Sequence, residues 1–202
     1  MLHITTHSGK LTGMHSISTS AIMNRHCAQR QDLRGSICEK CYAKDYLSFR
    51  KSLRVNMEDN TRQLTTRLLP PAELPTINDR YFRLEAFGDI ANVTQVENYF
   101  NICRKNHGTQ FALWTKNPAI IAQALRQAHK PVNLIIIYSS PMINRPVNDR
   151  IFSVFPFIDK VFTVYDKSHA QAVTINCGGR KCLECRRCYS KRTGKRVNEI
   201  LK

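Results

Sequence analysis

The chain has 202 residues, 42% of them hydrophobic, and its 31 Lys and Arg against 15 Asp and Glu give a formal net charge of +16. This length suits one domain over residues 1–202 with a sizeable core. No apolar run reaches the roughly 18 residues that a membrane span needs, and the N-terminus lacks a signal-peptide layout. We therefore expect a cytoplasmic protein with no membrane contact, whose charge favours nucleic acid or another polyanion as a partner.

Strand-like and helix-like segments alternate along the chain. Residues 14–23 alternate apolar and polar side chains and predict a strand. An apolar stripe predicts one long helix over 42–69, which Pro70 and Pro71 would end. The further predicted elements, in chain order, are a strand over 80–86, a helix over 93–106, a strand over 110–114, a helix over 118–129, strands over 132–138 and 160–165, and a short helix from about 191.

This alternation predicts an α/β fold in which a parallel sheet is connected by right-handed crossovers. Either a partial or irregular TIM-barrel-like (β/α) barrel or an open sheet fits, with residues 177–188 as a Cys-rich segment near the C-terminus. In both architectures the functional groups gather at the carboxyl ends of the strands.

Eight cysteines in a cytoplasmic protein point to metal or redox chemistry, because disulfides are rare in that compartment. Cys177, Cys182, Cys185 and Cys188 form a run with the spacing C-x4-C-x2-C-x2-C. A crowded run resembles ferredoxin-type iron–sulfur ligation, whereas structural zinc sites usually take two separated C-x2-C pairs, so zinc is the alternative. Four neighbouring Arg and Lys residues are expected to lower the thiol pKa values.

A second group consists of Cys27, Cys38 and Cys41, between the first predicted strand and the long predicted helix. Three thiolates could hold a 4Fe–4S cluster with one iron open to a ligand. Alternatively, Cys27 is an ordinary buried thiol and the other two share one site with the C-terminal cysteines. We expect Cys103 to be a core residue, and His26 is the one histidine placed beside a cysteine of this group.

Two residues at predicted strand ends are candidates for cofactor binding. Asp89 follows a glycine and could accept a hydrogen bond from a ligand, although a turn or cap role is the commoner one. Lys116 could bind an anionic ligand or be a solvated loop lysine. No phosphate-binding loop, nucleophile elbow or dinucleotide motif is present.

Together these segments resemble the small radical-SAM-like iron–sulfur proteins associated with bacteriophages. The resemblance covers most of the chain and is carried by Cys38-Glu39-Lys40-Cys41-Tyr42-Ala43, Phe87-Gly88-Asp89-Ile90, Leu113-Trp114-Thr115-Lys116-Asn117 and the C-terminal cysteine run. It implies a β/α-barrel-like fold with one or two iron–sulfur clusters, S-adenosylmethionine at an open iron, and the host cytoplasm as location. The first cysteine gap here is longer than in radical SAM enzymes.

The leading hypothesis is therefore an iron–sulfur protein with redox or radical chemistry at an open iron. The alternative is a basic nucleic-acid-binding module with a structural iron–sulfur or four-cysteine zinc site. The pattern singles out no catalytic side chains, so the sequence leaves open whether the protein is an enzyme.

Overall fold

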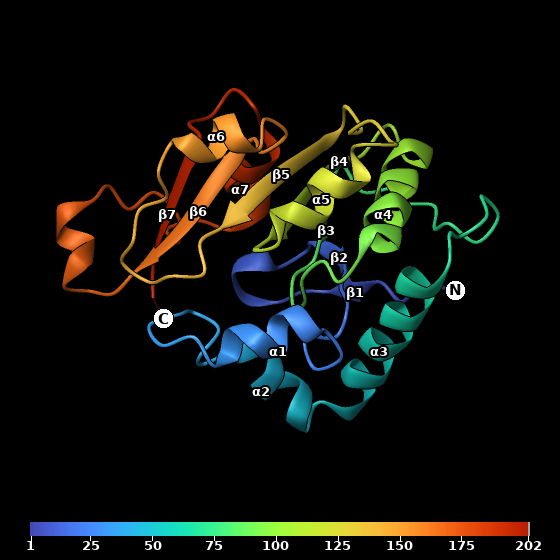
Figure 1. Cartoon of the computed structure of the whole chain (residues 1–202), viewed down its shortest axis with the longest axis horizontal. Coiled ribbons are helices and arrows are strands. Elements are labelled where there is room, and N and C mark those ends of the chain that lie inside the picture. The colour runs from blue at the N-terminus through green and yellow to red at the C-terminus, as the bar shows by residue number, and fades with distance from the viewer. Residues whose placement is uncertain (202) are drawn as a thin grey trace.

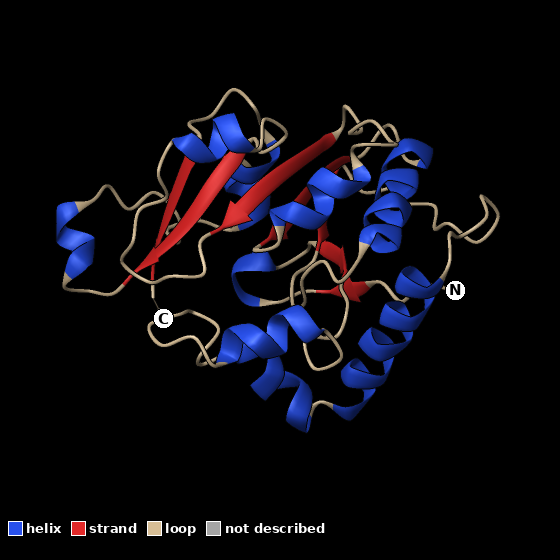
Figure 2. Ribbon diagram, viewed as in Figure 1, coloured by secondary structure: helices blue, strands red, loops and turns tan. Residues whose placement is uncertain are grey.

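A single seven-stranded sheet organises residues 1–201, the part of the chain that the computed structural model describes (Figures 1 and 2). The strands lie side by side in chain order, and all neighbours are parallel except β1 and β2. They are β1 (Thr5–Thr6), β2 (His15–Ile17), β3 (Tyr81–Leu84), β4 (Gln110–Thr115), β5 (Leu134–Ser139), β6 (Lys160–Tyr165) and β7 (Arg196–Ile200).

Helices connect the parallel strands, so the predicted α/β class is confirmed. They are α1 (Arg25–Gln31), α2 (Tyr42–Phe49), α3 (Lys51–Thr66), α4 (Val93–Lys105), α5 (Pro118–Ala124), α6 (Arg150–Val154) and α7 (Cys182–Cys185), with short 3-10 turns at Gly9–Leu11, His169–Ala172 and Arg187–Tyr189. Within the described residues β1 and β7 do not pair with each other, so the sheet is not a closed barrel. None of the described helices is long and apolar enough to cross a membrane.

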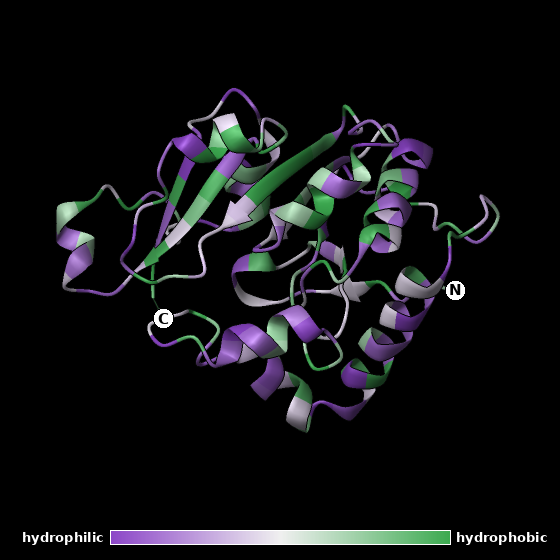
Figure 3. Cartoon of the chain, in the orientation of Figure 1, coloured by the Kyte–Doolittle hydropathy of each residue, from purple (hydrophilic) through white to green (hydrophobic). Residues whose placement is uncertain are grey.

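The two faces of the sheet have different covers, because alternate side chains of a strand point to opposite faces. On one face, Phe82, Phe111 and Ile136 pack in a core with side chains of α3, α4 and α5. On the other face, Ala112, Ile135 and Ile137 of the strands pack with Met14 and Tyr189 from outside the sheet. β5 is apolar along most of its length and buried on both faces, whereas α3 shows many hydrophilic residues to the outside (Figure 3).

The predicted helix over 42–69 is wrong in one respect: it is two helices. The chain leaves helical geometry at Arg50, with φ −99° and ψ 75°, and α3 starts at the next residue. The predicted stripe of Tyr42, Phe49, Met57 and Leu64 faces the core only in α3, which buries Met57 and Leu64. In α2 the buried residues are Ala43 and Leu47, and Tyr42 and Phe49 are exposed. Spacing alone did not reveal the break, because the stripe continues across it.

The predicted C-terminal helix is wrong as well. Residues 196–200 form β7, which pairs in parallel with β6 and buries Val197 completely. The segment is short and its apolar periodicity is weak, so pairing with β6 determines its conformation. The predicted strand over 14–23 is also shorter in the structure, because only His15–Ile17 pairs as β2.

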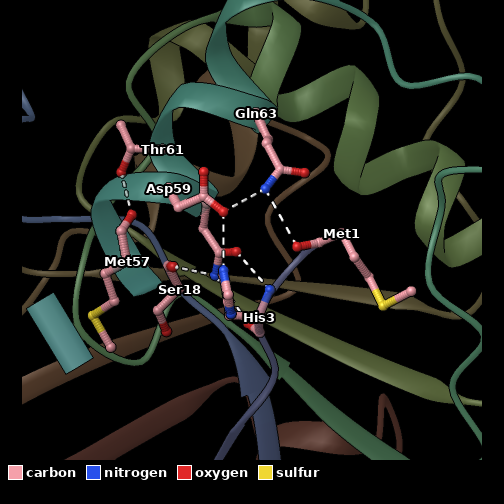
Figure 4. Close-up of polar contacts among 8 residues, drawn as sticks. Met1, His3, Ser18, Met57, Asp59, Thr61 and Gln63 are labelled. Carbon is pink, nitrogen blue, oxygen red and sulfur yellow. Dashed lines mark hydrogen bonds and ion pairs between the residues drawn. The ribbon is translucent and has the colours of Figure 1, made fainter. Parts of the chain in front are cut away.

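The N-terminus is tied to α3 by a small polar network (Figure 4). The buried side chain of Asn60 accepts a hydrogen bond from the His3 amide at 2.8 Å and donates to the carbonyls of His3 at 2.9 Å and Ser18 at 3.1 Å. Asp59 contacts the His3 ring at 2.9 Å and accepts a hydrogen bond from Gln63 at 2.7 Å. Asn60 therefore joins α3 to the chain just before β1 and just after β2.

We expect Asn60→Ala to lower the free energy of unfolding by about 2–4 kcal/mol, because it leaves buried backbone groups of His3 and Ser18 without partners. Gln63→Ala on the same helix is the control, and its partly exposed side chain should cost about 1 kcal/mol or less. Urea unfolding followed by circular dichroism measures both. Equal losses for the two variants would contradict the assigned role of Asn60.

Candidate metal centres

The four C-terminal cysteines line one cavity of about 550 Å³. Cys182 and Cys185 stand at the two ends of α7, a single helical turn. The chain bends before this turn at Gly178, with φ 118°, and after it at Arg186, with φ 53°. These left-handed positions allow one short segment to curl around the cavity.

The cysteine segment packs on the face of the sheet that the crossover helices leave uncovered. Tyr189 is 5% exposed, and its ring meets those of Tyr81 and Trp114 at centroid distances of 5.4 and 6.3 Å. Leu183 and Cys188 pack against the same apolar cluster. Trp114 also lines the cavity, so an indole forms part of its wall.

A lysine from the N-terminal region reaches this cavity. The Lys10 ammonium lies 2.8 Å from the Cys177 sulfur and 2.6 Å from a Glu199 carboxylate oxygen, with both ion-pair partners mostly buried. The two hydrogen bonds outweigh the effect of burial and hold the pKa of Lys10 above its usual value. Lys10 therefore supplies a permanent positive charge beside a thiol.

The pKa values of Cys177, Cys182 and Cys188 are raised, opposite to the shift expected from the sequence. Burial is the largest cause and raises the pKa of Cys188 to about 12, with further increases from Cys177 and Cys182. Burial also raises the pKa values of Cys177 and Cys182, while Lys10 acts in the opposite direction. The mutual effects show that these thiols are near neighbours, so charge on one disfavours charge on the next unless a cation intervenes.

The thiols line the cavity without converging on a point. Among residues 1–201, no three side chains of His, Cys, Asp or Glu come close enough to hold a single metal ion. The cavity wall also includes Lys10, Arg180, Arg186 and Arg187, so cations surround the thiols.

The N-terminal cysteines lie in another part of the molecule, at the carboxyl ends of the strands. Cys27 is on α1, Cys38 is in the following loop, and Cys41 is the residue before α2. Hydrogen bonds fix the loop to the end of β5, from the Ile37 amide to the Pro141 carbonyl at 2.8 Å and between the main chains of residues 35 and 143 at 3.1 Å. Figure 1 shows α1 and α7 well apart, and none of the three N-terminal cysteines lines the C-terminal cavity.

Cys27 has acidic and basic neighbours from the connections that follow β3 and β4. Burial raises its pKa well above the usual value, and the carboxylates of Asp89 and Glu85 raise it further, while Lys116 lowers it. Cys38 also contributes to the shift. The structure thus brings Cys27 together with Asp89 and Lys116, the two residues that the sequence suggested for cofactor binding.

Asp89 is 3% exposed, and main-chain and hydroxyl donors occupy its carboxylate. One oxygen accepts from the Thr115 hydroxyl at 2.6 Å and the Ile90 amide at 2.7 Å, and the other accepts from the Lys116 amide at 2.8 Å. Asp89 therefore orders the turn that carries Lys116. A direct cofactor contact by either side chain stays a prediction.

His26, the histidine beside Cys27, contacts the Arg30 guanidinium through its ring nitrogen at 2.9 Å. Burial lowers the pKa of His26, and Asp89 opposes this shift. Cys103 is completely buried in the helix-side core, as expected.

Glu85, which the sequence did not single out, is the central acidic group at this edge of the sheet. It is 2% exposed, has φ 59°, and accepts hydrogen bonds from the Tyr99 hydroxyl, from Gln95 at 2.7 Å and from the Thr19 hydroxyl at 2.9 Å and amide at 3.1 Å. Burial raises the pKa of Glu85 to about 7, against the effect of the Tyr99 and Thr19 hydrogen bonds. A strained, buried carboxylate at a strand end is typical of a functional edge.

Gly88 makes room for this arrangement, so we expect Gly88→Ala to be costly. An added Cβ would lie 2.4 Å from the Thr19 carbonyl oxygen and 2.7 Å from a Glu85 carboxylate oxygen. The variant should lose about 1–3 kcal/mol of unfolding free energy or more. Gly108→Ala is the control, because nothing lies within 4 Å of its Cβ position. A neutral Gly88→Ala variant would contradict the close approach.

The raised pKa of Glu85 predicts a pH-dependent stability. Because the folded-state pKa of about 7 lies above the ordinary value of 4.5, the contribution of Glu85 is fully present below about pH 4.5 and is lost as the pH rises through 7. Between pH 4.5 and 7 the free energy of unfolding should fall by up to roughly 3 kcal/mol because of Glu85, and Glu85→Gln should abolish this fall. Denaturant unfolding at several pH values measures it. An unchanged slope in the variant would assign the pH dependence to other groups.

One protein family matches this chain. The model of the family described as GP88: Gene product 88 matches residues 5–194. No curated protein and no solved structure shows significant similarity to the chain. The matched range includes both cysteine groups and every strand except β7. Since the match covers nearly the whole length, the chain belongs to the GP88 family, a phage-associated protein family.

Proposed function

We propose that the chain is an iron–sulfur protein with two centres, one in the C-terminal cavity and one at the carboxyl ends of the strands. The C-terminal centre would be held by Cys177, Cys182, Cys185 and Cys188. The strand-end centre would be held by Cys27, Cys38 and Cys41, which leaves one iron of a 4Fe–4S cluster open. Such a group, when bound, supplies one-electron redox chemistry.

The observation that carries this proposal is that four thiols line a single cavity with cations in its wall. A cluster with bound thiolates is negative, and the Lys10 ammonium beside Cys177 would offset part of that charge. Trp114 and Tyr189 would limit access of water from the sheet side.

The arrangement of the thiols favours a cluster over a single zinc ion. Zinc needs four sulfurs at about 2.3 Å from one point, whereas a cubane distributes its ligands around several irons. The crowded run C-x4-C-x2-C-x2-C resembles ferredoxin-type ligation more than two separated C-x2-C pairs, which supports a cluster.

The strand order supports a catalytic role for the second centre. Consecutive parallel strands follow the order of a partial, TIM-barrel-like (β/α) barrel, in which carboxyl-end loops supply the active site. Cys27, Cys38 and Cys41 lie in the first such loop, and Asp89 and Lys116 follow the next two parallel strands. Asp89 and Lys116 would orient a ligand at this centre, and S-adenosylmethionine is the candidate from the family resemblance.

Anaerobic purification with quantitation of iron, sulfide and zinc, together with EPR of the reduced protein, tests the proposal. We expect a brown protein with iron and sulfide in nearly equal amounts. Added S-adenosylmethionine should alter the EPR signal of the strand-end centre. A colourless, zinc-loaded protein would refute the iron–sulfur assignment.

Paired cysteine variants count the centres. Cys182→Ser/Cys185→Ser and Cys38→Ser/Cys41→Ser should each remove about half of the iron, because the two groups are separate. Loss of all iron from either pair alone would mean one shared site. Cys103→Ala is the control for removal of a thiol, since Cys103 is a core residue, and it should keep the full iron content.

A further inference from the structure

Exposed aromatic rings gather on the outside of α2. Tyr42 is 63% exposed and Phe49 is 64% exposed, which is unusual for rings of this size. Tyr46 lies between them on the same helix, half-buried, with its ring 5.3 Å from that of Phe49. Tyr42 and Phe49 thus expose most of their surface, although they lie beside other rings of the same segment.

The rings are held in defined positions. Phe87, which follows β3, stacks on Tyr46 at 5.8 Å and 26°, and on its other side it stacks on His7 at 5.8 Å and 22°. Tyr42 lies 6.1 Å from Phe87, and its hydroxyl donates to the Ala86 carbonyl at 2.6 Å. The row of rings is thus anchored to the sheet and is not a set of free side chains.

Positive charges alternate with the rings along the same segment. Between residues 40 and 51 there are four cations, all exposed, and one acid, Asp45. The Arg50 guanidinium lies over the Tyr46 ring at 5.2 Å. Within residues 1–201 none of the four forms an ion pair. The cations are Lys40, Lys44, Arg50 and Lys51.

We propose that this surface, which we call the α2 platform and define as Lys40, Tyr42, Lys44, Tyr46, Phe49, Arg50 and Lys51 together with Phe87, binds single-stranded nucleic acid. Bases would stack on the Tyr42 and Phe49 faces, and the cations would contact the phosphates. The rings and cations supply the binding without iron, but Lys40 and Tyr42 flank Cys41, a proposed ligand of the strand-end centre, so each platform variant is also tested for iron content.

The charge pattern favours nucleic acid over the other occupants of an aromatic surface. The aliphatic residues of α2, Ala43 and Leu47, are buried, so the exposed face is rings and cations with little apolar bulk to insert into a lipid bilayer. The cations around the C-terminal cysteines are also numerous, but of the rings there Tyr189 is buried and Tyr81 is half-buried. Among the aromatic side chains of residues 1–201, only Tyr42 and Phe49 are mostly exposed, and both lie beside cations that form no ion pair.

Fluorescence polarisation with labelled dT15 and U15 oligonucleotides at graded salt tests the proposal on the full-length protein as purified. Tyr42→Leu/Phe49→Leu removes two ring faces and keeps apolar bulk, and it should weaken binding about tenfold or more. Lys40→Gln/Lys44→Gln should reduce the slope of log K against log salt by about 1.4, since each phosphate contact contributes about 0.7 for single strands.

Two controls match these changes elsewhere on the surface. Val132→Ala removes a 91% exposed apolar side chain and should leave binding unchanged. Lys191→Gln/Arg192→Gln removes two exposed charges from the C-terminal segment. A loss in this second control as large as in Lys40→Gln/Lys44→Gln would overturn the assignment to α2.

Circular dichroism and iron content of each variant separate loss of fold or of metal from loss of the platform. Absence of oligonucleotide binding by the unmodified protein would overturn the proposal. So would binding to phosphatidylglycerol vesicles without binding to oligonucleotides, because it would assign the platform to a membrane surface. Binding that falls with the two platform variants and not with the controls supports the proposal.

Discussion

Consecutive parallel strands need crossovers that turn in the same direction, and this places the crossover helices on one face of the sheet. In this chain α3, α4 and α5 cover that face and form the helix-side core with it. The opposite face is equally apolar at Ile135 and Ile137, so another part of the chain must cover it. The cysteine segment, through Tyr189 and Leu183, is that cover. Its proposed metal centre is therefore also part of the core.

This double role connects distant parts of the chain. Lys10, near the N-terminus, contacts both Cys177 and Glu199 of β7, so the first and last segments of the protein meet at the thiol cavity. The edge strand β7 and the cysteine segment support each other, since Cys177 also bridges to Glu199 through the main chain. Ligation of metal by these thiols would stabilise the sheet edge along with the cavity.

At the carboxyl ends of the strands, two acidic side chains are buried, and their carboxylates need hydrogen-bond donors. Glu85 and Asp89 both lie inside the protein, and each is compensated by hydroxyl and amide donors instead of by an ion pair. Cys27 lies near them, so this edge combines a buried thiol of raised pKa with a carboxylate whose pKa is near neutrality. Such a group of buried, mutually shifted residues is typical of a site that binds or transforms a ligand.

The α/β alternation, the buried strand of Ile135 and Ile137 and the grouping of the C-terminal cysteines can all be predicted from the sequence, because periodicity and spacing are local properties. Local patterns misassigned the tail as a helix and passed over Glu85. Both depend on partners far away in the chain: β6 pairs with residues 196–200, while Thr19, Gln95 and Tyr99 surround the Glu85 carboxylate. The separation of the two cysteine groups follows from the fold alone, since the strand order that keeps them apart is a non-local property of the sheet.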